Sequence, residues 1–198
     1  MTVTRYYTAT TLDGYIADED NSLDWLFPVE GGDEEDFAGF FANVGAFAMG
    51  STTYTWVLEH ENLLAEPQKW REAYASVPAW VFSTRELPAI EGADIRFVRG
   101  DVRPVHHDMV EAAAGKDVWV VGGGDLAGQF ADAGLLDELV LAVAPVTLGR
   151  GAPLLPRRIT STRLTLRSVR QGGQFAHLTY TLRPPHAETP LQDADPPA

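Results

Sequence analysis

VWVVGGGDLAGQFADAG, residues 118–134, is the stretch that decides the fold of this chain. Four apolar residues, 118–121, run directly into Gly122, Gly123 and Gly124, and a helical pattern follows them. A strand without a polar face is typical of a parallel sheet that is covered on both sides. The segment therefore predicts a buried strand, a glycine turn and a helix, which is the repeating unit of an α/β fold.

The same glycine turn predicts a phosphate-binding site. Glycines let a ligand approach the backbone closely, and the free N–H groups of a helix N-terminus bind phosphate oxygens. The simpler interpretation is a turn that needs glycine only for its dihedral angles, but three consecutive glycines exceed that need. The turn is not a P-loop, because no Lys-Ser or Lys-Thr follows it, and Gly122, Gly124 and Gly128 only approximate a Rossmann pattern.

Short apolar runs on both sides of this stretch predict further strands that alternate with helices. Before it we expect strands at 3–9, 46–49, 79–82 and 95–98, and helices at 34–44, 52–59 and 105–114; a helix at 126–133 follows the glycines. After Gly134 three strand-like runs, 138–146, 163–170 and 175–182, follow without a helix between them, and residues 171–174 suit a tight hairpin. The pattern predicts an α/β fold with a mixed, mostly parallel central sheet that is flanked by helices and ends in a C-terminal antiparallel hairpin.

Composition indicates one globular domain. Of 198 residues 45% are hydrophobic and 22% are charged, so residues 1–183 are expected to form a single domain. Residues 184–198, with five prolines and three acidic side chains, are expected to form a flexible tail.

The charge and the missing cysteines exclude several functions. A net charge of −13 argues against nucleic-acid binding, and no segment predicts a membrane span or a secretion signal. The absence of cysteine excludes disulfides and makes the cytoplasm the expected compartment. The adjacent His106 and His107 have no partner at helical spacing, so they are expected to be exposed and no metal site is predicted.

Two other predicted strand ends carry turns with ligand-binding potential. One is Gly50, Ser51, Thr52 and Thr53, where helix capping is the favoured interpretation when the turn is taken alone. The other is Ser83, Thr84 and Arg85, where the arginine suits a phosphate or an adenine. Together with the glycine turn they would meet at the carboxyl edge of one sheet, which predicts a dinucleotide groove.

An acidic residue follows the first strand, in Leu12-Asp13-Gly14-Tyr15-Ile16-Ala17. Asp-Gly is an ordinary turn pair, so Asp13 has a purely structural interpretation of its own.

These segments, with residues 134–139 and 144–151, resemble the family of dihydrofolate reductase and of the C-terminal reductase domain of riboflavin-biosynthesis deaminase-reductases. The resemblance runs from about residue 3 to residue 182 and implies a dihydrofolate reductase-like fold, NADPH as the cofactor and a homodimer. The chain lacks the zinc-ligand motifs of the deaminase domain, so a stand-alone reductase domain is expected.

The resemblance also implies roles for the motif residues. The pyrophosphate would lie on a Gly-Gly turn whose peptide is often cis. A second cofactor contact would come from the turn that follows an early strand. The adenosine phosphate would lie near the turn that follows the next strand. Asp13 would handle a proton or anchor the substrate, helped by Trp25 and Arg150, although packing is the favoured role of Trp25. The implied cofactor contacts are Gly122, Gly123, Gly124, Asp125 and Leu126 in the first turn, Gly50, Ser51, Thr52 and Thr53 in the second, and Ser83, Thr84 and Arg85 in the third.

The implied activity is hydride transfer to a C=N or C=O group of a small pterin- or pyrimidine-like heterocycle, as in 5-amino-6-(5-phosphoribosylamino)uracil reductases. Ser51 stands where related reductases commonly have an arginine, which leaves NADPH against NADH open. A non-catalytic nucleotide- or ligand-binding protein that retains the fold is the main alternative, and a flavin-dependent oxidoreductase is a weaker one.

Overall fold

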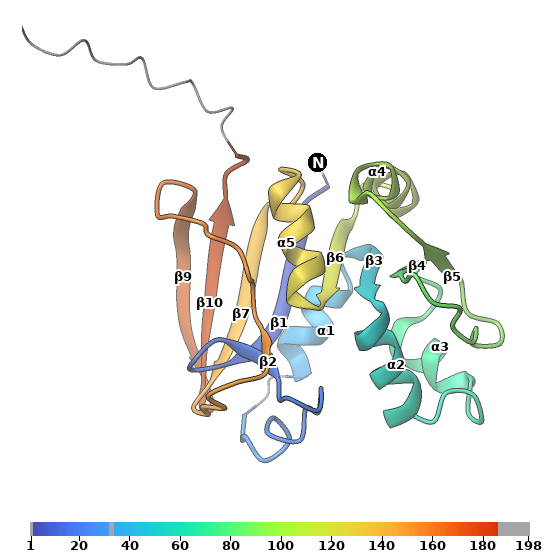
Figure 1. The fold of residues 1–198 in the computed structure, drawn as a ribbon, viewed down its shortest axis with the longest axis horizontal. Coiled ribbons are helices and arrows are strands. Elements are labelled where there is room, and N and C mark those ends of the chain that lie inside the picture. The colour runs from blue at the N-terminus through green and yellow to red at the C-terminus, as the bar shows by residue number, and fades with distance from the viewer. Residues whose placement is uncertain (1, 32–33, 186–198) are drawn as a thin grey trace, which may run out of the picture.

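The structure is a computed structural model that describes residues 2–31 and 34–185. Its main strands are β1 (Thr4–Thr11), β3 (Val44–Gly50), β4 (Ala79–Phe82), β5 (Ile95–Val98), β6 (Asp117–Gly122), β7 (Glu138–Ala144), β9 (Leu164–Gly172) and β10 (Phe175–Leu182). They form one eight-stranded sheet in the order β5-β4-β3-β6-β1-β7-β10-β9 (Figure 1). Strands β5 to β7 in this order are parallel, whereas β10 pairs antiparallel with both β7 and β9. The predicted mixed sheet with its C-terminal hairpin is confirmed.

Helices cover both faces of the sheet, and each face has its own apolar core. Strand β6 connects the two cores, because Val118 and Val120 belong to one and Trp119 to the other. This explains why the strand has no polar face. One face is covered by α4 (Val102–Ala113) and α5 (Gly124–Asp132), and the other by α1 (Glu34–Phe41), α2 (Ser51–His60) and α3 (Gln68–Tyr74).

The structure differs from the predictions at the ends of several elements and in three short elements that were not predicted. The helix predicted for 34–44 ends at Phe41, because Val44 is already the first residue of β3. Helix α3 was not predicted, since Trp70 is its only buried residue and one position gives no periodicity. The small sheet of β2 (Tyr15–Ala17) and β8 (Ala152–Pro153) is too short to show an alternating pattern.

Two further sequence expectations have different outcomes. His106 is half-buried rather than exposed, because it lies 2.8 Å from the hydroxyl of Thr4 and its ring meets the Phe130 ring edge-on. The tail at 184–198 stays a prediction, because all of it but Pro184 and Pro185 lies outside the described residues. Within the described residues, no helix has both the length and the apolar character that crossing a bilayer requires.

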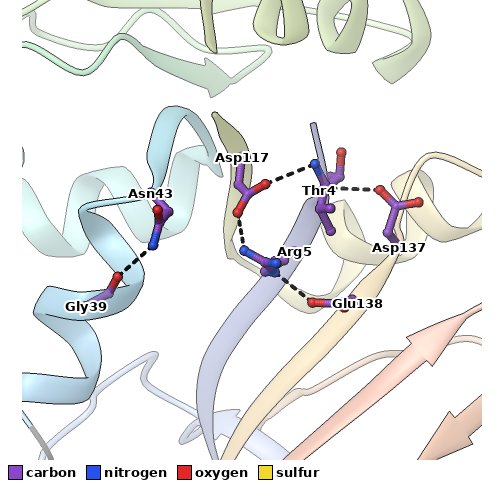
Figure 2. Close-up of polar contacts among 8 residues, drawn as sticks. Thr4, Arg5, Gly39, Asn43, Asp117, Asp137 and Glu138 are labelled. Atoms are coloured by element: carbon purple, nitrogen blue, oxygen red, sulfur yellow. Dashed lines mark hydrogen bonds and ion pairs between the residues drawn. The ribbon is translucent and has the colours of Figure 1, made fainter. Parts of the chain in front are cut away.

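Ion pairs join three strands at the amino edge of the parallel sheet. Figure 2 shows Arg5 of β1 between Asp117 of β6 and Glu138 of β7, and the distance from Arg5 Nε to Glu138 Oε2 is 2.7 Å. Asp137 accepts a hydrogen bond of 2.8 Å from the backbone N–H of Thr4. The acidic pair at 137–138 therefore serves strand entry, far from the carboxyl edge of the sheet.

Arg5→Ala is expected to lower the free energy of unfolding by about 1–3 kcal/mol, because two partly buried carboxylates lose their cation. The three side chains are only 15–25% exposed, so water replaces the arginine poorly. Urea denaturation measures the change. Arg103→Ala is the matched control, because its pair with Asp101 is more than half exposed and should contribute less than about 0.5 kcal/mol. Equal effects of the two substitutions would contradict the prediction.

Candidate functional site

A cavity of about 490 Å³ opens at the carboxyl edge of the sheet. Its walls come from the ends of β1 and β6, the beginnings of α2 and α5, and the loop between β2 and α1. In Figure 1 these strand ends lie at the lower side of the sheet, next to the first turns of both helices. This is the edge where open α/β sheets bind their ligands.

The N-termini of α2 and α5 meet beside this cavity. Gly50 is the N-cap of α2 and Gly123 is the N-cap of α5, and neither helix has a side-chain capping hydrogen bond. A methyl group on Gly50 would lie 3.7 Å from the backbone N of Gly123, so the two ends are in contact. The capping interpretation of residues 50–53 is therefore wrong, and both helix ends leave N–H groups free for an anion.

The three glycines of the turn have different structural reasons. Gly122 has a φ of +154°, where a side chain would be strained, and the Gly122-Gly123 peptide is cis. A methyl group on Gly123 would meet only Ile16 Cδ1, at 3.9 Å, so this residue opens towards the cavity. Gly124 is different, because a methyl group there would lie 2.1 Å from the carbonyl oxygen of Pro153. Gly122 and Gly123 suit a ligand, whereas Gly124 is required by packing.

Several predicted cofactor residues come together at the cavity. Six of them line it, and Gly50 touches the glycine turn from the α2 side. Asp125 is paired with Arg157 at 3.0 Å, and its pKa is lowered by hydrogen bonds from Gln129 and Arg157. The six are Thr52, Thr53, Gly122, Gly123, Gly124 and Asp125.

Other predicted cofactor residues are not among those that line this cavity. Leu126 packs in the core between α5 and the sheet. The hydroxyl of Ser83 is tied to the backbone of Arg85, by contacts of 2.8 and 3.0 Å. Arg85 itself lines a second cavity, of about 510 Å³, beside α2. The roles predicted for Ser51, Ser83, Thr84, Arg85 and Leu126 stay predictions.

Asp13 lies outside the residues that line the cavity and holds a loop in place. Its carboxylate accepts hydrogen bonds from the hydroxyl of Thr11 at 2.6 Å, from the N–H of Gly149 at 2.7 Å and from the N–H of Leu148 at 3.1 Å. The bond from Thr11 lowers the pKa of Asp13, and the two backbone bonds add to this effect. Asp13 therefore joins the β1–β2 turn to the loop before β8.

Asp13→Asn is expected to loosen this loop, since a neutral amide accepts more weakly from two N–H groups. Hydrogen exchange at the amides of Leu148 and Gly149 should accelerate by about tenfold, and Asp108→Asn on an exposed face of α4 should leave it unchanged. Because the folded pKa is lowered, the carboxylate stabilises the loop above its unfolded pKa of about 3.9 and loses this effect as the pH falls through the lower folded value. If Asp13→Asn keeps the slow hydrogen exchange of these two amides but loses catalytic turnover, the result would instead favour proton handling by Asp13.

The two remaining predicted substrate residues, Trp25 and Arg150, lie in different places. Trp25, in the loop after β2, lines the cavity, and its indole Nε1 is buried with no hydrogen-bond partner in the described part of the chain. Arg150 is 76% exposed, pairs with Glu19 at 3.4 Å and is not a lining residue. Trp25 is thus placed for a ligand contact, and Arg150 is placed at the surface.

Comparison with known proteins explains this arrangement. The sequence model of the RibD C-terminal domain matches residues 3–178. The chain belongs to the RibD C-terminal domain family. The uncharacterised protein YwjB of Bacillus subtilis (strain 168) is 30% identical to it over 177 residues, which are 89% of this chain and 96% of YwjB.

Solved structures extend this RibD C-terminal domain assignment to the fold. A putative riboflavin biosynthesis protein from Shewanella sp. PV-4 is similar with a TM-score of 0.74 and 25% identity, over 91% of this chain and 99% of that one. Dihydrofolate reductase from Enterococcus faecalis, complexed with NADP(H), is similar with a TM-score of 0.55 and 15% identity, over 91% and 96% of the two chains. The fold is therefore that of dihydrofolate reductase, as the sequence motifs predicted.

An aromatic wall of this RibD C-terminal domain was missed by the sequence reasoning. Tyr7, Phe37 and Trp119 line the cavity on one side, and Trp56 lines it from α2. The rings of Phe37 and Trp119 are 5.6 Å apart, edge to face. Trp56 follows Thr52 and Thr53 at helical spacing, which is the signal that would have found it.

Proposed function

We propose that this RibD C-terminal domain is an NADPH-dependent reductase that transfers a hydride to a C=N or C=O group of a small heterocyclic substrate. The observation that carries the proposal is the meeting of two uncapped helix N-termini at the floor of the cavity, at Gly50 and Gly123. A dinucleotide diphosphate carries two negative charges side by side, and two adjacent helix ends suit it better than one. Family membership and the likeness to reductase folds support the same activity.

The residues present fit a nicotinamide dinucleotide. Gly122 and Gly123 leave the floor of the cavity without side chains, and Thr52 and Thr53 line it from the first turn of α2. The bound cofactor supplies the hydride. The chain supplies orientation: the glycine turn and the α2 end would hold the diphosphate, while the aromatic wall would exclude water from the ring that is reduced.

Proton supply has few candidates within the cavity. Asp125 is an ionisable lining residue, but it is paired with Arg157 and its pKa is lowered, so it is a poor acid at neutral pH. Trp25 contributes its ring to the lining. We therefore propose that Trp25 orients the substrate by ring contact and that the proton comes from water.

Calorimetric titration with NADPH and then NADH tests the proposal. We expect micromolar binding of NADPH and clearly weaker binding of NADH, a difference that Arg85→Ala should reduce if Arg85 contacts the 2′-phosphate. No heat with either dinucleotide would overturn the reductase proposal. Equal affinities would leave a reductase that does not select for the phosphate, as Ser51 in place of the family's arginine allows.

A ligand-binding protein without catalysis is the second candidate. The observation in its favour is the position of Asp13, whose carboxylate is occupied by the loop at 148–149 rather than facing the cavity. Loss of NADPH absorbance in the presence of cyclic imines separates the two candidates. Binding without any oxidation across such a series would favour the non-catalytic protein.

A further inference from the structure

The cavity contains no positive side chain. All fifteen Lys and Arg residues lie in the described part of the chain, and none of them lines it. Asp125 is its one charged lining residue among those described, and it is negative. The nearby Arg157 donates to Asp125 at 3.0 Å and to Asp132 at 2.6 Å, so its charge is already matched by two carboxylates. A second anion would find no cation here.

The anion-binding groups at the cavity are the backbone N–H groups at the N-termini of α2 and α5, together with neutral donors such as the hydroxyls of Thr52 and Thr53. Under the proposed function the cofactor diphosphate occupies them, so the rest of the cavity must accept the substrate. Burial of an unpaired phosphate or carboxylate there would be strongly unfavourable, because its lost hydration is not replaced. The negative charge of the whole chain, −13, acts in the same direction.

The remaining walls suit a flat ring. Trp119 donates its indole N–H to the carbonyl of Tyr7 at 3.1 Å, so its polar atom is satisfied and its ring is left for apolar contact. Trp56 stacks on His60, with ring centroids 4.4 Å apart, which fixes the part of the lining that α2 provides. Trp25 also lines the cavity. Such a site fits an aromatic ring.

We infer that the substrate of this site is a flat, uncharged aromatic carbonyl or cyclic imine without a phosphate or carboxylate group. This inference rests on the proposed function for the location of the cofactor. It sets the site apart from one that accepts a phosphoribosyl substrate, because a phosphate would meet no positive side chain in the lining.

Titration with a matched pair of rings tests the inference. The first is quinoxalinone, an uncharged bicyclic ring with both a C=N and a C=O group, and the second is the same ring carrying a carboxylate. We expect quinoxalinone to bind the NADPH-loaded protein at least about tenfold more tightly than its carboxylate. Equal or tighter binding of the carboxylate, or no binding of either ring, would overturn the inference. Quenching of tryptophan fluorescence reads binding without turnover.

The same titrations on the protein without NADPH separate this inference from the proposed function. The walls of the cavity belong to the chain alone, so the uncharged ring should still bind even if NADPH fails to bind, while the free helix ends can then also accept the carboxylate. If the carboxylate ring is preferred without NADPH and this preference disappears when NADPH is bound, the helix ends attract the anion, as the inference requires. If the carboxylate ring is still preferred when NADPH is bound, the inference is overturned.

Two substitutions localise the effect. Val57→Lys adds a cation to the wall and should improve binding of the carboxylate ring by about tenfold, whereas Val57→Met should not. Trp25→Ala removes one aromatic ring from the lining and should weaken quinoxalinone binding by about fivefold to tenfold. Unchanged quinoxalinone affinity in Trp25→Ala would overturn the inference of an aromatic ring site.

Discussion

Gly50→Asp is expected to weaken NADPH binding by about 100-fold while the free energy of unfolding stays equal or rises. Gly50 is the N-cap of α2 with an extended backbone, φ −78° and ψ 163°, and has no side-chain cap. Aspartate is a preferred residue at this position, so it should stabilise the helix. Its carboxylate would, however, take the free N–H groups and place a negative charge beside Gly123, where the diphosphate is proposed to bind.

Calorimetry and thermal unfolding on the same sample measure the two opposite effects. Gly50→Ser is the control, because it caps the helix without a charge and its Cβ has ordinary contacts of 3.7 and 3.8 Å. It should keep most of the affinity. If aspartate and serine reduced NADPH binding equally, the loss would come from the lost glycine rather than from charge, and the helix ends would not be the diphosphate site.

Most of the fold was predictable because parallel strands leave a strong local signal. The run at 118–121 is apolar at every position, since Val118 and Val120 face one core and Trp119 the other. The hairpin glycines and the alternation of residues 175–182 predicted the antiparallel end in the same way. What escaped prediction was short or held by few contacts, such as α3 with its single buried residue, Trp70.

The candidate site was only partly predictable because it has two kinds of wall. The glycine turn is continuous in sequence and its function follows from backbone chemistry, so Gly122 and Gly123 were found. The aromatic wall is assembled from β1, α1, α2 and β6, and a lone Tyr7 or Trp119 has the same pattern as a core residue. Asp13 shows that an acidic side chain near a strand end can serve a loop, and its predicted catalytic role stays a prediction.

Gly124→Ala is expected to lower the free energy of unfolding by about 3 kcal/mol, which is a large part of a domain's stability. The new methyl group would lie 2.1 Å from the carbonyl oxygen of Pro153 and 2.4 Å from that of Leu154. Both are backbone atoms of residues 153–154, a segment that we call the strap. The strap is held by a hydrogen bond of 3.1 Å from the hydroxyl of Tyr6 to the carbonyl of Leu154, and by one of 2.9 Å from the N–H of Leu154 to the carbonyl of Gly14. The segment at residues 153–154 cannot move without breaking these bonds, so α5 must shift.

Gly39→Ala makes the same chemical change in a helix without the contact. Gly39 lies in α1, and a methyl group there would meet nothing within 4 Å, so alanine should stabilise the protein by about 0.5–1 kcal/mol. Urea denaturation of both variants gives the difference between their free energies of unfolding. The gain in helix propensity is common to both substitutions, so this difference reports the contact of residue 124 with the strap. Because the strap also supplies Pro153 to the cavity, Gly124→Ala should weaken ligand binding as well. Two stabilised variants would mean that residues 153–154 do not pack on α5 in solution, and that this wall of the cavity is open.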